Sequence, residues 1–294
     1  MLKYVSCNLC GIDDAEILFS VQGFNIVRCR RCGLSYINPR LDTKNLRELY
    51  SLSYFKSVDS TIYGYDDYIG DWEAITETFR RRWDIMRPFL PKAGAMLDVG
   101  CAGGFLMKVA KENGWTAMGL DISEDMANYG RTHFGHDITV GKLPETNFKK
   151  ESFDLVTTWD AIEHSTDPLG DIQSMSRLLK PGGILSIITP DSDSLHAKLF
   201  GKKWVEYLRP REHTYFLSFG TLRTMLDRTG LDIKKHTTVG KLVTWKFALN
   251  RLNCYWPKTV SVIAGLMRAL GLYDKTCYIN PMDKMLVIAE KEKN

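Results

Sequence analysis

A glycine-rich heptapeptide, Asp98-Val-Gly-Cys-Ala-Gly-Gly104, separates an apolar run at 95–99 from a stretch with helical periodicity that begins at Phe105. Glycines at such a turn let a ligand lie against bare backbone, where a Cβ would hold it off. Asp121 follows about 20 residues later, the spacing at which a carboxylate at the tip of the second strand accepts hydrogen bonds from both hydroxyls of a ribose. The pattern predicts an adenosine-type ligand on the nucleotide-binding half of a doubly wound α/β sheet.

The identity of the adenosine ligand depends on where the glycines fall. The dinucleotide fingerprint G-x-G-x-x-G would need glycines at 100, 102 and 105, and the chain carries Ala102 and Phe105 at the last two. S-adenosylmethionine has no pyrophosphate, so a D-x-G-x-G/A-x-G loop suffices for it, and the chain fits that form. The alternative, in which Gly103-Gly104 is only a connecting turn, leaves the paired Asp121 unexplained.

Further motifs follow the glycine loop in a fixed order. They are Gly141-Lys-Leu-Pro, Ser152-Phe-Asp-Leu-Val, Ala161-Ile-Glu-His164, Asp167-Pro, Leu178-Leu-Lys-Pro-Gly-Gly-Ile-Leu and Thr189-Pro-Asp191. With them, residues 95–190 resemble a class I S-adenosylmethionine-dependent methyltransferase. The resemblance implies a Rossmann-like seven-stranded sheet. It also implies a set of cofactor-binding residues, namely Asp98, Gly100, Ala102 and Gly104 in the loop, Asp121 and Ile122 at ribose and adenine, Leu143 at the adenine edge, and Trp159 at the methionine moiety. Lys142 departs from the family, which often has an acidic residue there.

Composition is that of an ordinary globular protein. Of 294 residues, 44% are hydrophobic and 25% are charged, and the net charge is +4. The chain has no uncharged apolar run of about 18 residues, so no transmembrane helix is expected. Its first residues lack the apolar core of a signal peptide. We therefore expect a cytoplasmic location.

Four cysteines set the N-terminal segment apart. Cys7 and Cys10 are separated by two residues, as are Cys29 and Cys32, and 18 residues lie between the pairs. This is the spacing of a four-thiolate zinc site, and two disulfides are the alternative. We predict a zinc ribbon over residues 1–40 with a hairpin of 15–21 and 25–28. Four thiolates leave zinc no open position, so we expect structural zinc, whose binding, worth about 10–16 kcal/mol, folds the ribbon.

A tyrosine-rich connector and a capping helix are expected at 41–92, before a methyltransferase domain at 93–294. Helical spacing of apolar residues predicts the helix at 66–87. The connector tyrosines are more simply explained by packing, and Tyr65 is the one that we nominate for substrate binding.

The loop at 204–216 concentrates aromatic, basic and titratable groups ahead of a helix expected at 218–229. Ligands of an open α/β sheet bind beyond the carboxyl ends of the strands, where this loop must lie. Residues 196–251 hold twelve Lys or Arg and four Asp or Glu. The excess predicts a small anionic substrate, with Arg209 and Arg211 as binding residues, and a merely solvated basic face is the alternative.

The pattern Arg209-Pro-x-Glu212-His213-x-x-Phe216, together with the ribbon, resembles a methyltransferase subgroup that includes deoxysugar C-methyltransferases and relatives from polysaccharide biosynthesis. By that resemblance Glu212 and His213 face the substrate. A base must remove a proton from the acceptor, and His213 suits this role because an imidazole titrates near neutrality. His164 is the competing base.

The segment at about 241–275 reads as a helical insertion of one or two amphipathic helices, followed by a final strand at 285–290 that pairs with 231–237. Aromatic residues alternate there with basic ones. A peripheral contact with the inner face of a membrane is one interpretation, and a lid or dimer contact is the other.

Three functions remain open. The first is methyl transfer to a nucleotide-linked or lipid-linked sugar, by C- or O-methylation. The second is a ribosomal or transfer RNA methyltransferase, but the chain has Thr158-Trp-Asp-Ala161 in place of the Asn/Asp-Pro-Pro-Tyr/Phe loop typical of amino-directed enzymes, so nucleic acid is not the expected partner. The third is a non-catalytic S-adenosylmethionine-binding module, which would be expected to lose the glycine loop or Asp121.

Overall fold

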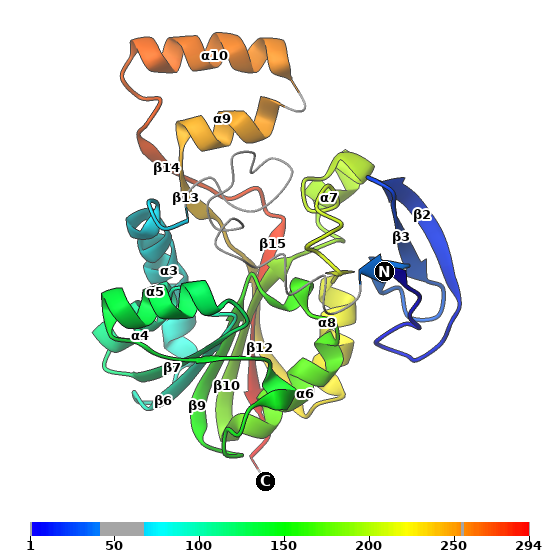
Figure 1. Cartoon of the computed structure of the whole chain (residues 1–294), viewed down its shortest axis with the longest axis vertical. Coiled ribbons are helices and arrows are strands. Elements are labelled where there is room, and N and C mark those ends of the chain that lie inside the picture. Colours follow the sequence, from blue (N-terminus) through cyan, green and yellow to red (C-terminus); the bar gives the residue numbers. More distant parts are fainter. Residues whose placement is uncertain (1, 42–67, 254–255, 294) are drawn as a thin grey trace.

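A seven-stranded sheet forms the centre of the computed structural model, which describes residues 2–41, 68–253 and 256–293 (Figure 1). The strands lie in the order β12-β15-β10-β9-β6-β7-β8. Their bounds are β6 Ala95–Val99, β7 Thr116–Asp121, β8 Asp137–Val140, β9 Phe153–Trp159, β10 Leu179–Pro190, β12 Leu231–Thr238 and β15 Lys284–Lys291. The pairs from β10 to β8 are parallel, and β15 is antiparallel to both of its neighbours. The predicted α/β sheet is confirmed.

Helices cover both faces of the sheet (Figure 1). On one side lie α3 Trp72–Met86, α4 Phe105–Glu112 and α5 Glu124–Phe134, and on the other lie α6 Pro168–Leu178 and α8 Phe219–Asp227. Shorter helices are α7 Leu195–Phe200, η1 Arg87–Phe89, η2 Leu143–Glu145, η3 Ile162–His164 and η4 Gly201–Lys203. The helix expected at 66–87 is α3, with residues 66 and 67 outside the described part of the chain.

Alternating side chains of β10 and β15 explain the two layers. Leu185 and Val287 belong to the core beneath α6 and α8, whereas Ile184 and Ile288 belong to the core beneath α3 and α4. Successive side chains of a strand point to opposite faces, so a continuous apolar run produces a sheet buried on both sides. Strand β6 is parallel to its neighbours β7 and β9, so the loops that follow these three strands meet at one edge of the sheet.

The N-terminal segment forms a second sheet, of four strands in the order β11-β4-β3-β2. Its members are β2 Ala15–Val21, β3 Phe24–Cys29, β4 Ser35–Ile37 and β11 Tyr215–Phe216, while β1 Leu2–Lys3 pairs with β5 Arg40–Leu41. The predicted hairpin is present, with Gln22 and Gly23 both at positive φ as a tight hairpin turn requires. The fourth strand, β11, comes from the loop at 204–216 and was not expected.

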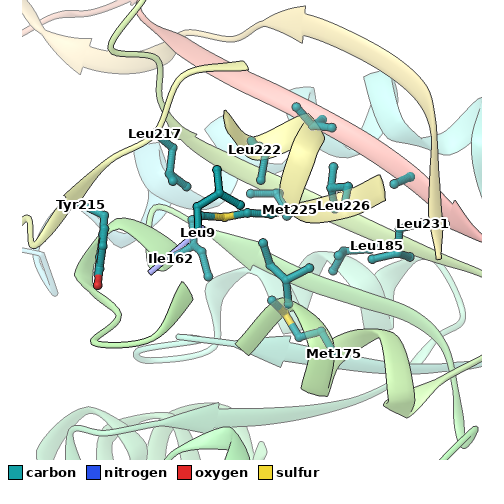
Figure 2. Packing of buried hydrophobic residues seen from close by; sticks show 14 of the residues in the cluster. Leu9, Ile162, Met175, Leu185, Tyr215, Leu217, Leu222, Met225, Leu226 and Leu231 are labelled. Carbon is teal, nitrogen blue, oxygen red and sulfur yellow. The ribbon is translucent and has the colours of Figure 1, made fainter. Parts of the chain in front are cut away.

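Leu9 joins this ribbon to the main core. Its side chain is 2% exposed and belongs to the same buried cluster as Leu217 and Leu222. Figure 2 shows Leu9 among Ile162, Leu217 and Met225. The ribbon therefore shares a hydrophobic core with the large sheet.

An insertion separates β12 from β15. It consists of the two-stranded sheet β13 Lys241–Thr244 and β14 Thr276–Ile279, which carries α9 Trp245–Asn253 and α10 Pro257–Ala269. These helices lie where a helical insertion was expected, and they project away from the large sheet (Figure 1). Among the described residues, no helix is long and apolar enough to span a membrane.

The shared core predicts that replacing Leu9 destabilises the whole protein. We expect Leu9→Ala to lower the free energy of unfolding by about 2–5 kcal/mol, the usual cost of emptying a buried leucine site. The control Leu18→Ala, on the ribbon but 39% exposed, is expected to stay within about 0.5 kcal/mol of wild type. Urea unfolding followed by tryptophan fluorescence measures both, and equal stabilities for the two variants would contradict the shared core.

Candidate active site

A cavity of about 400 Å³ opens at the edge of the sheet where β6, β7 and β9 end. The loops after these strands form its floor, and α3 with the start of the insertion closes it from the other side. The residues that matter for its chemistry are Gly100, Ala102, Asp121, Ile122, Lys142, Leu143, Trp159, Asp160, His164, Arg82, Lys241 and Lys284. Six of the eight predicted cofactor residues, all but Asp98 and Gly104, are in this lining.

The glycine loop is shaped by close approach. At Gly100, whose φ is +78°, an added Cβ would lie 2.4 Å from the Cβ of Ala161. At Gly104, whose φ is +79°, it would lie 2.4 Å from Cδ2 of His136. Gly100 thus lets the loop after β6 pack closely against Ala161 in the cavity lining. Gly104 lets the start of α4 pack against His136 and does not line the cavity.

Asp121 closes the loop from the neighbouring strand. Its carboxylate accepts the backbone N–H of Ala102 at 2.7 Å and that of Ser123 at 2.8 Å. Each oxygen accepts one of these bonds and retains a second lone pair. Because Asp121 also lines the cavity, the donor set fits a ribose diol. Burial raises the pKa of this carboxyl.

Apolar side chains continue the cavity on both sides of Asp121. Ile122 and Leu143 line one part, and Trp159 lines another with its indole N–H bonded to Ser186 Oγ at 2.9 Å. Such walls suit an adenine ring and a methionine chain. Asp98 takes no part in this, since it is 3% exposed and accepts the hydroxyl of Thr157 at 2.6 Å, which ties β6 to β9.

The predicted bases are arranged in two layers. His164 lines the cavity, and its Nδ1 lies 3.0 Å from the carbonyl oxygen of Glu212. His213 is 4% exposed and packs edge-on against His164, with ring centroids 4.7 Å apart, and Nδ1 of His213 is 3.4 Å from a Glu206 oxygen. Neither Glu212 nor His213 lines the cavity. Burial lowers the pKa of both histidines.

Ligand atoms of Glu163, His164 and His213 lie within 4.8 Å of one another, a separation that a metal ion could bridge. Burial and the charge of Asp160 raise the pKa of Glu163 to about 8. The positive charges of Lys284 and Arg209 act on both histidines. A neutral carboxyl and neighbouring cations both disfavour a metal cation at this cluster.

Two of the predicted substrate-binding residues, Arg209 and Arg211, do not line the cavity. Arg209 is 9% exposed and lies 3.7 Å from the Glu212 carboxylate. Arg211 is exposed on the surface. Tyr65 lies outside the described residues. The roles predicted for these three residues stay predictions.

Charged residues missed by the sequence reasoning form a further part of the cavity wall. Asp160, directly after β9 and at φ 56°, accepts Arg82 at 3.2 Å and also contacts Lys284. Burial would raise the pKa of Asp160, but these two cations outweigh it and lower that pKa. Lys241 lines the same wall. The one sequence feature that could have pointed to Asp160 as a site residue is its position directly after the strand that is now β9.

The four ribbon cysteines converge. The sulfurs of Cys7 and Cys32 are 3.4 Å apart, those of Cys10 and Cys29 are 3.5 Å apart, and all four lie within 4.8 Å of one another. Tetrahedral zinc with Zn–S bonds of about 2.3 Å would separate its sulfurs by roughly 3.8 Å. The cluster therefore fits a closed zinc site, and zinc itself stays a prediction.

Comparison with known proteins agrees with this geometry. A family model described as "Methyltransferase domain" matches residues 72–236. A ubiquinone biosynthesis O-methyltransferase of Thiobacillus denitrificans is 30% identical over 170 residues, which cover 54% of this chain and 72% of that protein. A protein of the same name from Aliivibrio fischeri MJ11 is 29% identical over 46% of this chain and 63% of its own length, under two thirds.

Solved structures share the fold. An S-adenosylmethionine-dependent methyltransferase of Archaeoglobus fulgidus superposes with a TM-score of 0.53 at 18% identity, over 76% of this chain and 99% of that one. A Bacillus halodurans C-125 protein assigned as a methyltransferase gives 0.54 at 19% identity, over 73% and 99%.

The position of Asp121 predicts a specific loss of cofactor affinity. We expect Asp121→Asn to weaken S-adenosylmethionine binding by about tenfold or more, because an amide supplies one acceptor where the carboxylate supplies two. Isothermal titration calorimetry measures this, with Asp137→Asn, an exposed carboxylate at the start of β8, as the control. Thermal unfolding separates lost affinity from lost fold, and a folded variant with unchanged affinity would contradict the ribose assignment.

The cysteine geometry predicts a tightly bound metal. We expect atomic emission to detect zinc in the wild type and none in Cys29→Ser. We also expect this variant to expose residues 2–41 to limited proteolysis, because metal binding would supply the ribbon's folding free energy. Cys277→Ser, outside the cluster, is the control. Wild-type protein without zinc, or a Cys29→Ser variant that retains it, would refute the zinc ribbon.

Proposed function

This chain belongs to the methyltransferase-domain family, and we propose that it transfers the methyl group of S-adenosylmethionine to an oxygen or carbon atom of a small anionic acceptor such as a nucleotide-linked or lipid-linked sugar. One observation carries the proposal. A single cavity is lined by Gly100 and Asp121 in one part and by His164 and three cationic side chains in another. This arrangement supports adjoining positions for cofactor and acceptor in one cavity.

S-adenosylmethionine supplies an electrophilic methyl group on a sulfonium. Transfer is an in-line displacement, so the alignment of acceptor and methyl group accounts for much of the acceleration. The residues of this chain have two tasks, which are to hold the acceptor in line and to take up its proton.

We assign the removal of the acceptor's proton to His164. A carbonyl oxygen can only accept, so the contact with Glu212 requires the proton on Nδ1 and leaves Nε2 as the basic nitrogen. Burial keeps the ring neutral by lowering its pKa. Nε2 could then take the proton of an acceptor hydroxyl, or a proton next to a ketone before transfer to carbon. His213, the base predicted from the sequence, would support the His164 ring from behind.

The names of the curated relatives favour oxygen as the methylated atom, because those proteins are O-methyltransferases. The sugar class rests on the sequence pattern around Glu212 and His213. The RNA alternative is weakened because two of the twelve basic residues that suggested it are not on the outer surface: Arg209 is buried and Lys241 lines the cavity.

Helix α10 favours a lipid-linked acceptor over a nucleotide-linked one. Val262, Leu266 and Leu270 lie one helical turn apart and are 74%, 60% and 61% exposed. Residues 241–275 contain six Lys or Arg and one acidic residue. An apolar stripe with basic surroundings suits the surface of an anionic membrane. Membrane contact and the expected cytoplasmic location stay proposals.

Turnover tests the assignment. The protein is incubated with methyl-labelled S-adenosylmethionine and a panel of nucleotide sugars, lipid-linked sugars in anionic vesicles, and RNA. We expect transfer to a sugar, and His164→Gln to lower it by about 100-fold or more with unchanged cofactor affinity, as loss of a general base does.

His133→Gln, exposed on α5, is the matched control, and we expect a smaller loss for His213→Gln than for His164→Gln. Full turnover in His164→Gln with none in His213→Gln would return the base to His213. Labelled RNA with no labelled sugar would overturn the acceptor class.

A further inference from the structure

Three cations face the acceptor part of the cavity with one carboxylate between them. Arg82 and Lys284 both pair with Asp160, the first at 3.2 Å. Lys241 lines the same wall, and no carboxylate of the described residues lies within ion-pair distance of it. Positive charge is thus in excess at a wall where Arg82 is buried and both lysines are half-buried, and a cation that has lost part of its hydration is costly unless an anion accompanies it.

The position of Lys241 is fixed from both sides by α3. Arg82 Nε donates to the carbonyl of Gly240 at 3.2 Å, and the backbone N–H of Leu242 donates to Thr78 Oγ1 at 2.9 Å. The Lys241 ammonium also lies 4.4 Å from the ring centroid of Phe247. Two backbone anchors and one aromatic face hold this side chain at the cavity wall, as a preformed binding site requires.

Gly240 shows that this arrangement tolerates little change. An added Cβ there would lie 2.2 Å from the carbonyl oxygen of Ile279. Gly240, directly before β13, is therefore packed against the last residue of β14. The insertion and α3 together bring Lys241 to the cavity.

The pKa of Lys241 reflects the neighbouring positive charges. Burial first, and then the charges of Lys284 and Arg251, lower the pKa of Lys241 to about 7. Asp160 opposes this shift and Arg209 adds to it. An incoming anion would relieve this repulsion.

We infer that Lys241 and Lys284 form a subsite for an oxyanion, and that this subsite binds the carboxylate or phosphate group of the methyl acceptor. The inference rests on the proposed function and specifies it, because it places the acceptor's charge on residues of β13 and β15. Lys241 belongs to the insertion, so the insertion would select the acceptor as well as cover it.

Anion binding to the full chain tests the subsite. Inorganic pyrophosphate and benzoate are titrated separately by calorimetry at low ionic strength and pH 6.0, which lies below the pKa of Lys241, so that most Lys241 side chains are protonated. We expect at least one of them to bind the wild type, and Lys241→Met to bind it about tenfold more weakly or worse, because a charge-assisted hydrogen bond is lost. Lys241→Arg, which keeps the charge, should retain binding.

The matched control is Lys246→Met, which removes an exposed charge from the same insertion and should leave anion affinity unchanged. Failure to bind either probe, equal losses in Lys241→Met and Lys246→Met, or full binding by Lys241→Met would each overturn the subsite. Binding of pyrophosphate alone would point to a phosphate-bearing acceptor, and binding of benzoate alone to a carboxylate.

S-adenosylmethionine is titrated into the same preparations. Normal uptake without anion binding would remove the subsite and leave the proposed function standing. Absence of uptake by the wild type would remove the proposed function itself.

Discussion

The Asp160 carboxylate is the contact on which the architecture of the cavity depends. It lies directly after β9 and pairs with Arg82 from α3 and with Lys284 from the start of β15. Three segments distant in sequence thus meet at one half-buried charge. Without Asp160, two cations would be left without their partner, which costs far more than an exposed pair would contribute. The sheet brings these elements near one another, and Asp160 fixes them as the walls of one compartment.

The ribbon contacts this compartment through backbone hydrogen bonds and not through its cysteine cluster. The N–H of Ile37 donates to the carbonyl of Thr214 at 3.0 Å, and the N–H of Thr214 donates to the carbonyl of Glu163 at 3.0 Å. Glu163 directly precedes His164 in η3. Two successive backbone hydrogen bonds therefore connect strand β4 of the ribbon to the residue next to the proposed base.

The cofactor half of the site could be predicted from the sequence because its chemistry is local. A turn that needs glycine and a carboxylate at the next strand tip leave a short, ordered signature, as Gly100 and Asp121 do. The acceptor half could not be predicted in the same way. Arg82, Lys241 and Lys284 lie on separate elements and meet only through tertiary packing. His213 has the residue type of a base, but its burial behind His164 is visible only in the structure.

The most direct measurement is a crystal structure of the full chain with S-adenosylhomocysteine. We expect the ribose hydroxyls on Asp121, the adenine between Ile122 and Leu143, and the sulfur directed toward His164, with space left beside Lys241. A nucleoside bound elsewhere, or a sulfur directed away from His164, would contradict it.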